Sequence, residues 1–338
     1  MGLRPAGQSG SDGLTILTWR KRDYPVTGIF HLRHYPVFEE GVFEDHPALF
    51  DRFAHYTSEN LRGRFREAWK TLPRYEHTLT WSVVVGPGFC GGTHPGADNV
   101  FIEAMLGSND FVYDSDCLYA NPSRKVFAIS DPPGITDASR RLFGRLDQHL
   151  HKRGIDDLEA ILNELNRETA PSDGATLSLI AFPAPPSITG PRRAVAFIAG
   201  DSYVFRGNLS HQRMTAVEGI PEFIGTPHTY LEPVTIDLDE GDFFIIASDG
   251  ILSIRGNDRE RALVDILRER VDGNLQDFAF RAIRDSNQCL EETIYDRPMT
   301  RFGGSDNVSA LLVYPEELAD VTSQESFLIG GYKARHPA

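Results

Sequence analysis

The chain has 338 residues, of which 41% are hydrophobic, and this share excludes a wholly disordered protein. Its formal net charge of −14 argues against a chain-wide role on nucleic acid or a membrane surface, because both of these partners are negatively charged. No apolar stretch approaches the ~20 residues of a membrane-spanning helix, and the first 13 residues lack the apolar core of a signal peptide.

Residues 1–75 are predicted to form an N-terminal extension that packs on the main domain. Alternating apolar residues predict strands at 14–19 and 27–35. A helix is predicted next, because four apolar side chains fall on one helical face: Leu61, Phe65, Trp69 and Leu72. Residues 76–316 are predicted to be the main domain, and residues 317–338 a C-terminal tail.

The main domain combines short apolar runs with two pairs of helices. Seven runs are predicted as strands, at residues 79–85, 99–104, 126–129, 177–182, 194–199, 243–247 and 308–313. Several are continuously apolar, which is typical of strands covered on both faces. The predicted helix pairs are 136–150 with 155–165 and 259–271 with 275–283. This order is not a strict alternation of strand and helix, and it favours an α+β fold of two stacked sheets with helices outside.

Acidic residues stand where these apolar runs begin or end. Asp131, Asp201 and Asp249 each follow a run, whereas Asp98 and Asp306 each stand shortly before one. If these carboxylates meet, each pair at ~5 Å repels by roughly 3 kcal/mol at an effective dielectric near 20. A divalent cation removes that cost, and oxygen ligands favour Mg²⁺, Mn²⁺ or Ca²⁺.

Each acid also has an ordinary structural interpretation. An Asp-Gly pair such as Asp249-Gly250 is common in turns, and Asp201-Ser202 is compatible with a local cap. The group Asp110, Asp114 and Asp116 is expected to be a solvated loop.

The cysteines carry no recognisable chemistry. Three are present without CxxC spacing, which favours a reducing, cytoplasmic localisation. Cys90, in the glycine-rich segment 88–92, is interpreted as a bystander; the alternative is a thiolate loop that holds phosphate.

Taken in order, these segments resemble the metal-dependent protein phosphatases of the PPM, or type 2C, family. The resemblance covers roughly residues 78–314. The matching segments are Val126–Asp131, Gly174-Ala175-Thr176-Leu177, Gly200-Asp201-Ser202, Ser248-Asp249-Gly250 and Ser305-Asp306-Asn307-Val308-Ser309, with a weaker match at Ala97-Asp98-Asn99.

The resemblance implies a four-layer α-β-β-α sandwich, in which two stacked, mainly antiparallel sheets are flanked by helix pairs. It also implies a centre of two Mn²⁺ or Mg²⁺ ions, or of only one. Asp131, Asp249 and Asp306 would hold one ion, and Asp131 would bridge to a second ion that also takes the carbonyl of Pro132. Asp98 would act through waters on the metals, and Asp201 would help to hold a third ion.

The implied function is hydrolysis of phosphoserine or phosphothreonine in proteins by a metal-activated water, with signalling phosphoproteins as substrates. The family's usual glycine after the first metal aspartate is replaced by Pro132, and its usual histidine by Pro133. The phosphate-binding arginine expected five residues before Asp98 is Thr93, so His94, Arg140, Arg206 and Arg301 become candidates for the phosphate contact.

These departures keep two alternatives open. One is a pseudophosphatase with the same fold that binds phosphoproteins or regulates them. The other is an acidic structural protein whose Asp-Gly pairs are turns. The sequence indicates neither a nucleic-acid nor a membrane partner, and it leaves the oligomeric state undetermined.

Overall fold

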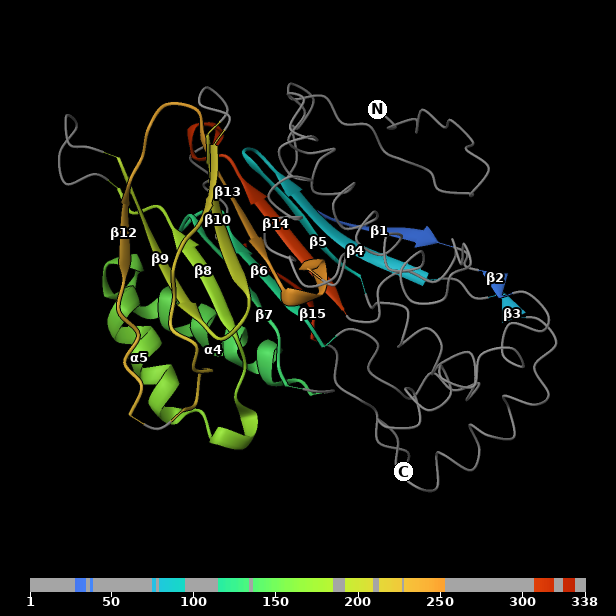
Figure 1. Ribbon diagram of the computed structural model, residues 1–338, viewed down its shortest axis with the longest axis horizontal. Helices are drawn as coiled ribbons and strands as arrows, with labels where there is room; N and C mark the ends of the chain where they lie inside the picture. Colours follow the sequence, from blue (N-terminus) through green and yellow to red (C-terminus); the bar gives the residue numbers. More distant parts are fainter. Residues whose placement is uncertain are drawn as a thin grey trace.

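The computed structural model describes residues 28–34, 37–38, 75–76, 79–94, 115–133, 136–184, 192–208, 213–226, 228–252, 307–318 and 325–331. Within these ranges the strands form two large antiparallel sheets and one short antiparallel pair (Figure 1). The short pair consists of β2 (Val37–Phe38) and β3 (Tyr75–Glu76).

Seven of the described strands form the first large sheet. Their order is β1 (Gly28–His34), β4 (Leu79–Gly86), β5 (Phe89–His94), β14 (Val308–Val313), β13 (Asp242–Ala247), β10 (Tyr203–Asn208) and β11 (Arg213–Ala216). β1 pairs with β4 along its whole length, from Gly28 opposite Val85 to His34 opposite Leu79. A strand of the N-terminal segment is therefore part of this sheet.

Six described strands form the second sheet. Their order is β12 (Val234–Asp237), β9 (Arg193–Ala199), β8 (Leu177–Ala181), β7 (Val126–Ser130), β6 (Cys117–Asn121) and β15 (Phe327–Gly330). Every residue of β6, β7 and β8 is buried, as expected for strands that are covered on both faces.

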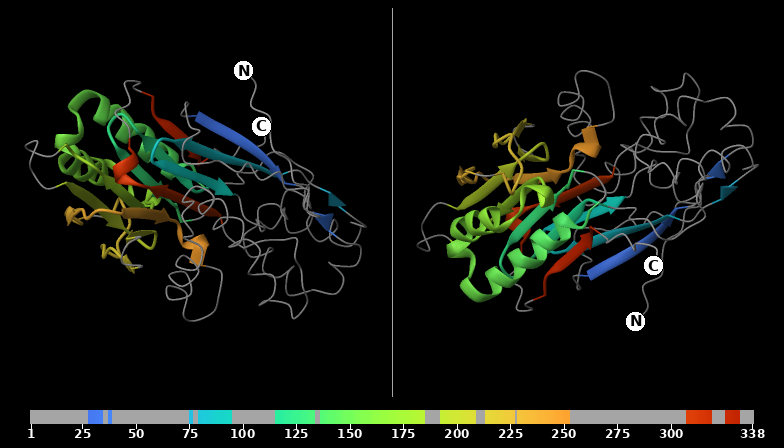
Figure 2. Two further views of the ribbon diagram at one scale, coloured as in Figure 1. Left: turned by 90° about the horizontal axis from the view of Figure 1, so that it is seen from above. Right: turned by 90° about the horizontal axis from the view of Figure 1, so that it is seen from below.

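Two helices cover the outer face of the six-stranded sheet. α4 (Ala138–Arg153) and α5 (Leu158–Glu168) are joined by a short 3₁₀ turn, η1 (Ile155–Asp157), and lie together on one side of the strands (Figures 1 and 2). Their apolar faces pack into one cluster with the outward side chains of β6 to β9. The hydroxyl of Tyr119, beneath α4, donates to the carboxylate of Asp147 at 2.8 Å. Burial raises the pKa of Tyr119, and the nearby charge of Asp147 raises it further, so this hydroxyl stays a donor.

Aromatic side chains fill the space between the two sheets. The ring of Phe89 on β5 lies 5.1 Å from that of Phe127 on β7. Phe182, after β8, contacts Phe127 at 6.3 Å and Phe244 of β13 at 5.6 Å. Each of these ring contacts stabilises the fold by about 1 kcal/mol beyond the burial of its apolar area. Together they help to hold the two sheets face to face.

The outer face of the seven-stranded sheet is also apolar and covered. Phe244 and Ile246 belong to the cluster between the sheets, so the alternate residues Phe243 and Ile245 face outward. These two outward side chains are only 3% and 2% exposed. The second helix pair, 259–283, remains the predicted cover, and it lies outside the described residues.

The predicted fold class is confirmed: the chain has an α+β arrangement of stacked antiparallel sheets with helices outside. Six of the seven predicted strands of the main domain are present, and residues 99–104 lie outside the described part. The predicted strand at 27–35 is β1, and the predicted pair 136–150 and 155–165 corresponds to α4 and α5. Within the described part of the chain, none of the helices combines the length and apolarity needed to span a membrane.

β5 was not predicted, because its segment is rich in glycine. It lies between β4 and β14, where Gly91 is opposite both Val84 and Leu311. A Cβ on Gly91 would stand 2.7 Å from the carbonyl oxygen of Ala310, so only glycine permits this approach. Segment 88–92 thus includes the start of a buried strand, and Cys90 on it is 1% exposed, which supports its interpretation as a bystander.

We expect Gly91→Ala to lower the free energy of unfolding by about 1–3 kcal/mol, because the new methyl meets backbone that cannot turn away. Gly144→Ala is the matched control: a Cβ there meets nothing within 4 Å, and in the middle of α4 it should stabilise by about 1 kcal/mol. Urea unfolding followed by circular dichroism measures both. Equal stability of the two variants would contradict the strand assignment.

Candidate functional site

Those predicted site residues that the structure describes stand at one common edge of the sandwich. In the seven-stranded sheet, β5 ends at His94 opposite Val308, which begins β14. β13 ends at Ala247, which is paired with Tyr203 at the start of β10. We call this end of the sandwich the motif edge: it comprises His94, Asp131, Thr176, Asp201, Ser202, Asp249 and Asn307.

The six-stranded sheet ends at the same edge. Cys117 begins β6 opposite Ser130, the last residue of β7, and Leu177 begins β8 opposite Ala199, the last residue of β9. The segment Gly200-Asp201-Ser202 then crosses from β9 in one sheet to β10 in the other. Motifs that are far apart in the sequence are therefore neighbours, because strand ends of both sheets meet here.

Buried hydroxyl groups connect these motifs. The backbone N–H of Asp131 donates to Oγ1 of Thr176 at 2.8 Å, and the N–H of Thr176 donates to the carbonyl oxygen of Asp131 at 2.8 Å. The hydroxyls of Thr176 and Ser202 share a further hydrogen bond of 2.6 Å. Thr176 is 1% exposed and Ser202 2%, so both hydroxyls are removed from bulk water.

Gly200 permits this close approach of the two sheets. Its φ of +85° favours glycine, and a Cβ would lie 2.9 Å from the methyl carbon of Thr176 and 2.9 Å from the ring of Phe223. The Gly-Asp-Ser segment thus needs its glycine so that Ser202 can reach Thr176.

Two further hydroxyls hold the segments that carry Asp249 and Asp306. The N–H of Ser309 donates to Oγ of Ser248 at 3.0 Å, and the N–H of Ser248 donates to the carbonyl oxygen of Ser309 at 3.0 Å. Oγ of Ser115, just before β6, donates to Oδ1 of Asn307 at 2.7 Å. The residue next to Asp306 is therefore anchored to the opposite sheet.

The described acids occupy different depths at the motif edge. Asp131 directly follows β7 and is partly exposed, and Pro132 after it is buried. Asp249 is also partly exposed and begins a 3₁₀ turn, η3 (Asp249–Leu252), whereas Asp201 is exposed between β9 and β10. His94 ends β5, and Asp98 and Asp306 lie outside the described residues.

The donor chemistry at this edge suits a hard cation. Asp131 and Asp249 offer carboxylate oxygens, which Mn²⁺ and Mg²⁺ prefer, and both are carried on backbone that hydrogen bonds hold in place. Among the described residues, no three His, Cys, Asp or Glu side chains form a group that could hold a metal ion. A metal site at this edge would therefore need a ligand beyond the described pair, and the predicted ligands Asp306 and Asp98 lie outside the described residues.

One acidic residue differs from its expectation. Asp116 was expected in a solvated loop, but it is 0% exposed. It directly precedes β6, and its carbonyl oxygen accepts the N–H of Gly331 at 2.7 Å after β15. The strand pair β6–β15 therefore carries Asp116 into the interior of the motif edge, and the expectation was wrong for this residue.

The position that matches the family's phosphate-binding arginine is buried. Thr93, on β5 between Ser82 and Ser309, is 1% exposed. The guanidinium of Arg140 on α4 donates to the carbonyl oxygen of Gly330 at 2.8 Å, which uses this side chain to hold the end of β15. Arg301 lies outside the described residues.

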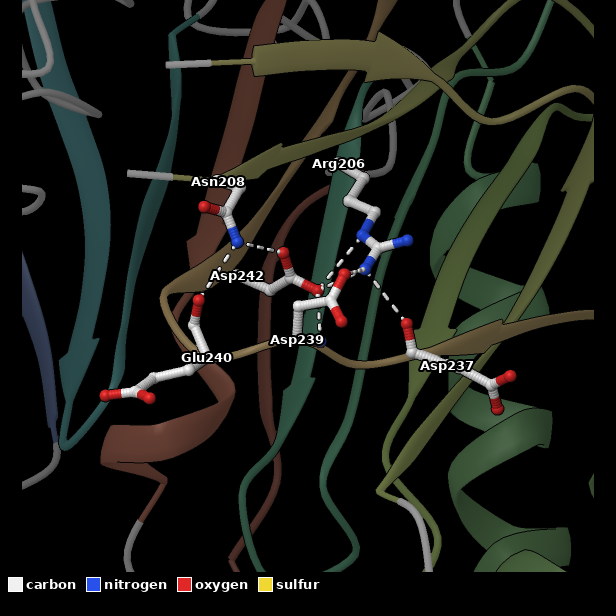
Figure 3. A network of polar contacts seen from close by, with 6 residues as sticks. All are labelled: Arg206, Asn208, Asp237, Asp239, Glu240 and Asp242. Atoms are coloured by element: carbon white, nitrogen blue, oxygen red, sulfur yellow. Dashed lines mark hydrogen bonds and ion pairs between the residues drawn. The ribbon is translucent and has the colours of Figure 1, made fainter. Parts of the chain in front are cut away.

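Arg206 is excluded as a phosphate contact by its position at the opposite edge of the sandwich. Its guanidinium donates to the carboxylate of Asp242 at 2.5 Å and to that of Asp239 at 3.0 Å (Figure 3). Asn208 donates to the other carboxylate oxygen of Asp242 at 2.7 Å. A pocket of about 580 Å³ also opens at this opposite edge, and Arg192, Asp242 and Glu316 are among its lining residues.

We expect Arg206→Ala to destabilise the protein by about 3 kcal/mol, because it removes the cation beside Asp242, whose side chain is 2% exposed. Arg193→Ala, which breaks an exposed ion pair with Asp237, should cost less than about 1 kcal/mol. Thermal and urea unfolding measure both changes. Equal destabilisation by the two substitutions would contradict this structural role of Arg206.

Comparison with known proteins gives structural neighbours only. No protein-family model and no curated protein matches the sequence. The SiaA-PP2C domain of Pseudomonas aeruginosa is 17% identical, with 60% of this chain and 80% of that chain covered and a TM-score of 0.45.

Two further solved structures are similar in the same way. The catalytic domain of the serine/threonine phosphatase PstP in complex with two manganese ions is 16% identical, with coverage of 64% and 92% and a TM-score of 0.40. The PPM Ser-Thr phosphatase MsPP of Mycobacterium smegmatis, in complex with cacodylate, is 18% identical, with coverage of 59% and 91% and a TM-score of 0.40. These three solved structures are thus a PP2C domain, the catalytic domain of a serine/threonine phosphatase and a PPM phosphatase.

Proposed function

We propose that this chain is a cytoplasmic, metal-dependent phosphatase that hydrolyses phosphoserine or phosphothreonine in proteins with Mn²⁺ or Mg²⁺. The observation that carries the proposal is the convergence of five ordered motifs at the motif edge. Hydrogen bonds join the segments of Asp131, Thr176 and Ser202, and others join those of Asp249 and Asn307 to their neighbours. Turns that served only the fold would have no reason to gather acids at one edge.

In this proposal Asp131, Asp249 and Asp306 would hold the first ion. Asp131 and the carbonyl of Pro132 would hold the second, Asp98 would act through water, and Asp201 would contribute to a third. When bound, the divalent ions supply a water of lowered pKa and positive charge for the phosphoryl oxygens. The chain's own contribution is to hold the carboxylates on rigid strand ends, so that their geometry is set before substrate arrives.

The proposed roles follow from where the side chains are carried. Asp131 and Asp249 come from different sheets, so a substrate phosphate between them would meet both layers of the sandwich. Both are partly exposed, as residues that receive a solvent-borne phosphoprotein must be. His94 ends β5 at the same edge and is the proposed phosphate contact in place of the missing arginine.

The alternative function is a pseudophosphatase that binds or regulates phosphoproteins. It is favoured by one observation, the burial of Thr93 where the family has a phosphate-binding arginine. Arg206 cannot replace that arginine, since it lies at the other edge beside Asp242. In this alternative the chain still has its metal ligands but lacks the side chain that binds the transferred phosphoryl group.

Activity separates the two functions. We expect the purified chain to hydrolyse p-nitrophenyl phosphate and a phosphoserine peptide only with Mn²⁺ or Mg²⁺. Asp249→Asn and Asp131→Asn should each lower turnover by more than the ~10–100-fold that loss of an outer partner of a metal ligand costs. Asp237→Asn, an exposed acid at the opposite edge, is the control and should be unchanged. Wild-type turnover no greater than that of Asp249→Asn would refute the enzyme.

Metal uptake is a separate expectation. Calorimetric titration with Mn²⁺ should give one or two ions per chain for the wild type, and Asp249→Asn should abolish at least one of them, because it removes an anionic ligand. Uptake without turnover would select the pseudophosphatase. The absence of stoichiometric heat in the wild type would leave only the structural interpretation of the Asp-Gly pairs.

A further inference from the structure

We propose that the hydroxyls of Thr176 and Ser202 form a positioning bridge that fixes the distance between the two metal-ligand strands across the sandwich. The inference rests on the proposed function and deepens it, because it says what holds the ligands. Thr176 directly precedes β8 of the six-stranded sheet, and Ser202 directly precedes β10 of the seven-stranded sheet. Their hydroxyl oxygens are 2.6 Å apart.

The bridge begins at the backbone of Asp131. Both backbone groups of Asp131 bond to Thr176: its N–H to the side-chain oxygen and its carbonyl oxygen to the N–H, each at 2.8 Å. These bonds continue the pairing of β7 with β8 beyond Ile129 and Ser178. Asp131 therefore sits where Thr176 places it.

The bridge ends near Asp249. Ser202 directly precedes Tyr203, which is paired with Ala247, and Asp249 follows Ala247 by two residues. A continuous path thus runs from the N–H of Asp131 through two hydroxyls to the strand pair that carries Asp249. Because a shared ion tolerates little change in ligand spacing, a shift between the sheets at this edge would weaken metal binding.

The surroundings leave little room for another arrangement. Gly200 places its α-carbon against the methyl of Thr176, and that methyl is 2.9 Å from where a Cβ would stand. Both hydroxyl-bearing residues are at most 2% exposed, so water cannot readily substitute for a deleted hydroxyl. A buried, tightly packed hydroxyl pair keeps one geometry, as a positioning device requires.

The chain offers a matched control for the loss of a buried hydroxyl pair. Oγ of Ser130 donates to Oγ of Ser139 at 2.8 Å, and both residues are 0% exposed. This pair also adjoins Asp131, but it joins β7 to α4 and does not cross between the sheets. Ser139→Ala therefore removes a comparable bond that lies next to Asp131 but does not connect the two sheets.

The test compares Mn²⁺ affinity, measured by calorimetry on the full chain, in four variants. Ser202→Ala and Thr176→Val should each weaken binding by about tenfold, the lower end of the effect of an outer partner of a metal ligand. Thr176→Ser, which keeps the hydroxyl, and Ser139→Ala should each stay within about twofold of the wild type. Thermal unfolding confirms that the compared variants are folded.

A second readout needs no metal. In the metal-free protein, amide exchange followed by NMR should be faster at the N–H of Asp131 in Thr176→Val, which loses the acceptor. It should also be faster in Ser202→Ala, which frees the acceptor to move. Ser139→Ala should not accelerate it. This pattern, together with the affinity ranking, supports the bridge.

One result would contradict the bridge alone, and another would contradict the proposed function itself. If the wild type binds Mn²⁺ and Ser202→Ala binds it equally tightly, or if Ser139→Ala weakens binding as much, the bridge is refuted and the proposed function stands. If the wild type takes up no Mn²⁺, the proposed metal chemistry is refuted, and the positioning role of Thr176 and Ser202 falls with it.

Discussion

The hydrogen bonds of Thr176 are the interaction on which the motif edge depends. A stacked pair of sheets is held mainly by apolar contacts, here the chain of rings from Phe89 through Phe127 and Phe182 to Phe244. The hydrophobic part of these contacts is non-directional, so it sets the spacing of the layers better than their lateral alignment. The 2.6 Å contact between the hydroxyls of Thr176 and Ser202 is directional, so it adds the alignment that the rings alone do not provide.

The same device recurs at a second acid. The hydroxyl of Thr176 accepts the N–H of Asp131, and the hydroxyl of Ser248, the residue before Asp249, accepts the N–H of Ser309. These hydroxyls bind backbone groups, so the bonds that anchor the segments use none of the carboxylate oxygens as acceptors. Clustered carboxylates repel one another by a few kcal/mol per pair, so a rigid backbone is needed to keep them together before a cation binds.

The sequence correctly predicted strands that are buried on both faces, because such strands have continuous apolar runs, as in β7, β8 and β13. It also placed acids at strand ends, since a polar residue after such a run must lie at an edge. It failed for β5, where Gly91 is required by the carbonyl oxygen of Ala310 on a strand more than 200 residues later. It failed for Asp116 for a similar reason, because the segment that binds its carbonyl oxygen, Gly331 after β15, is also distant in the sequence.

In the proposed function, metal binding and phosphate binding would depend on different parts of the motif edge. The segments of Asp131 and Asp249 are anchored by Thr176 and Ser248, and neither anchor involves β5. Thr93, where the family places its phosphate-binding arginine, is buried on β5 between two other strands. Loss of the arginine therefore leaves the anchors of the acids intact, so a chain of this design can retain metal while its turnover depends on whatever cation faces the phosphate. We therefore expect metal affinity to depend on the strand ends of both sheets. The Michaelis constant for a phosphopeptide should depend on the end of β5.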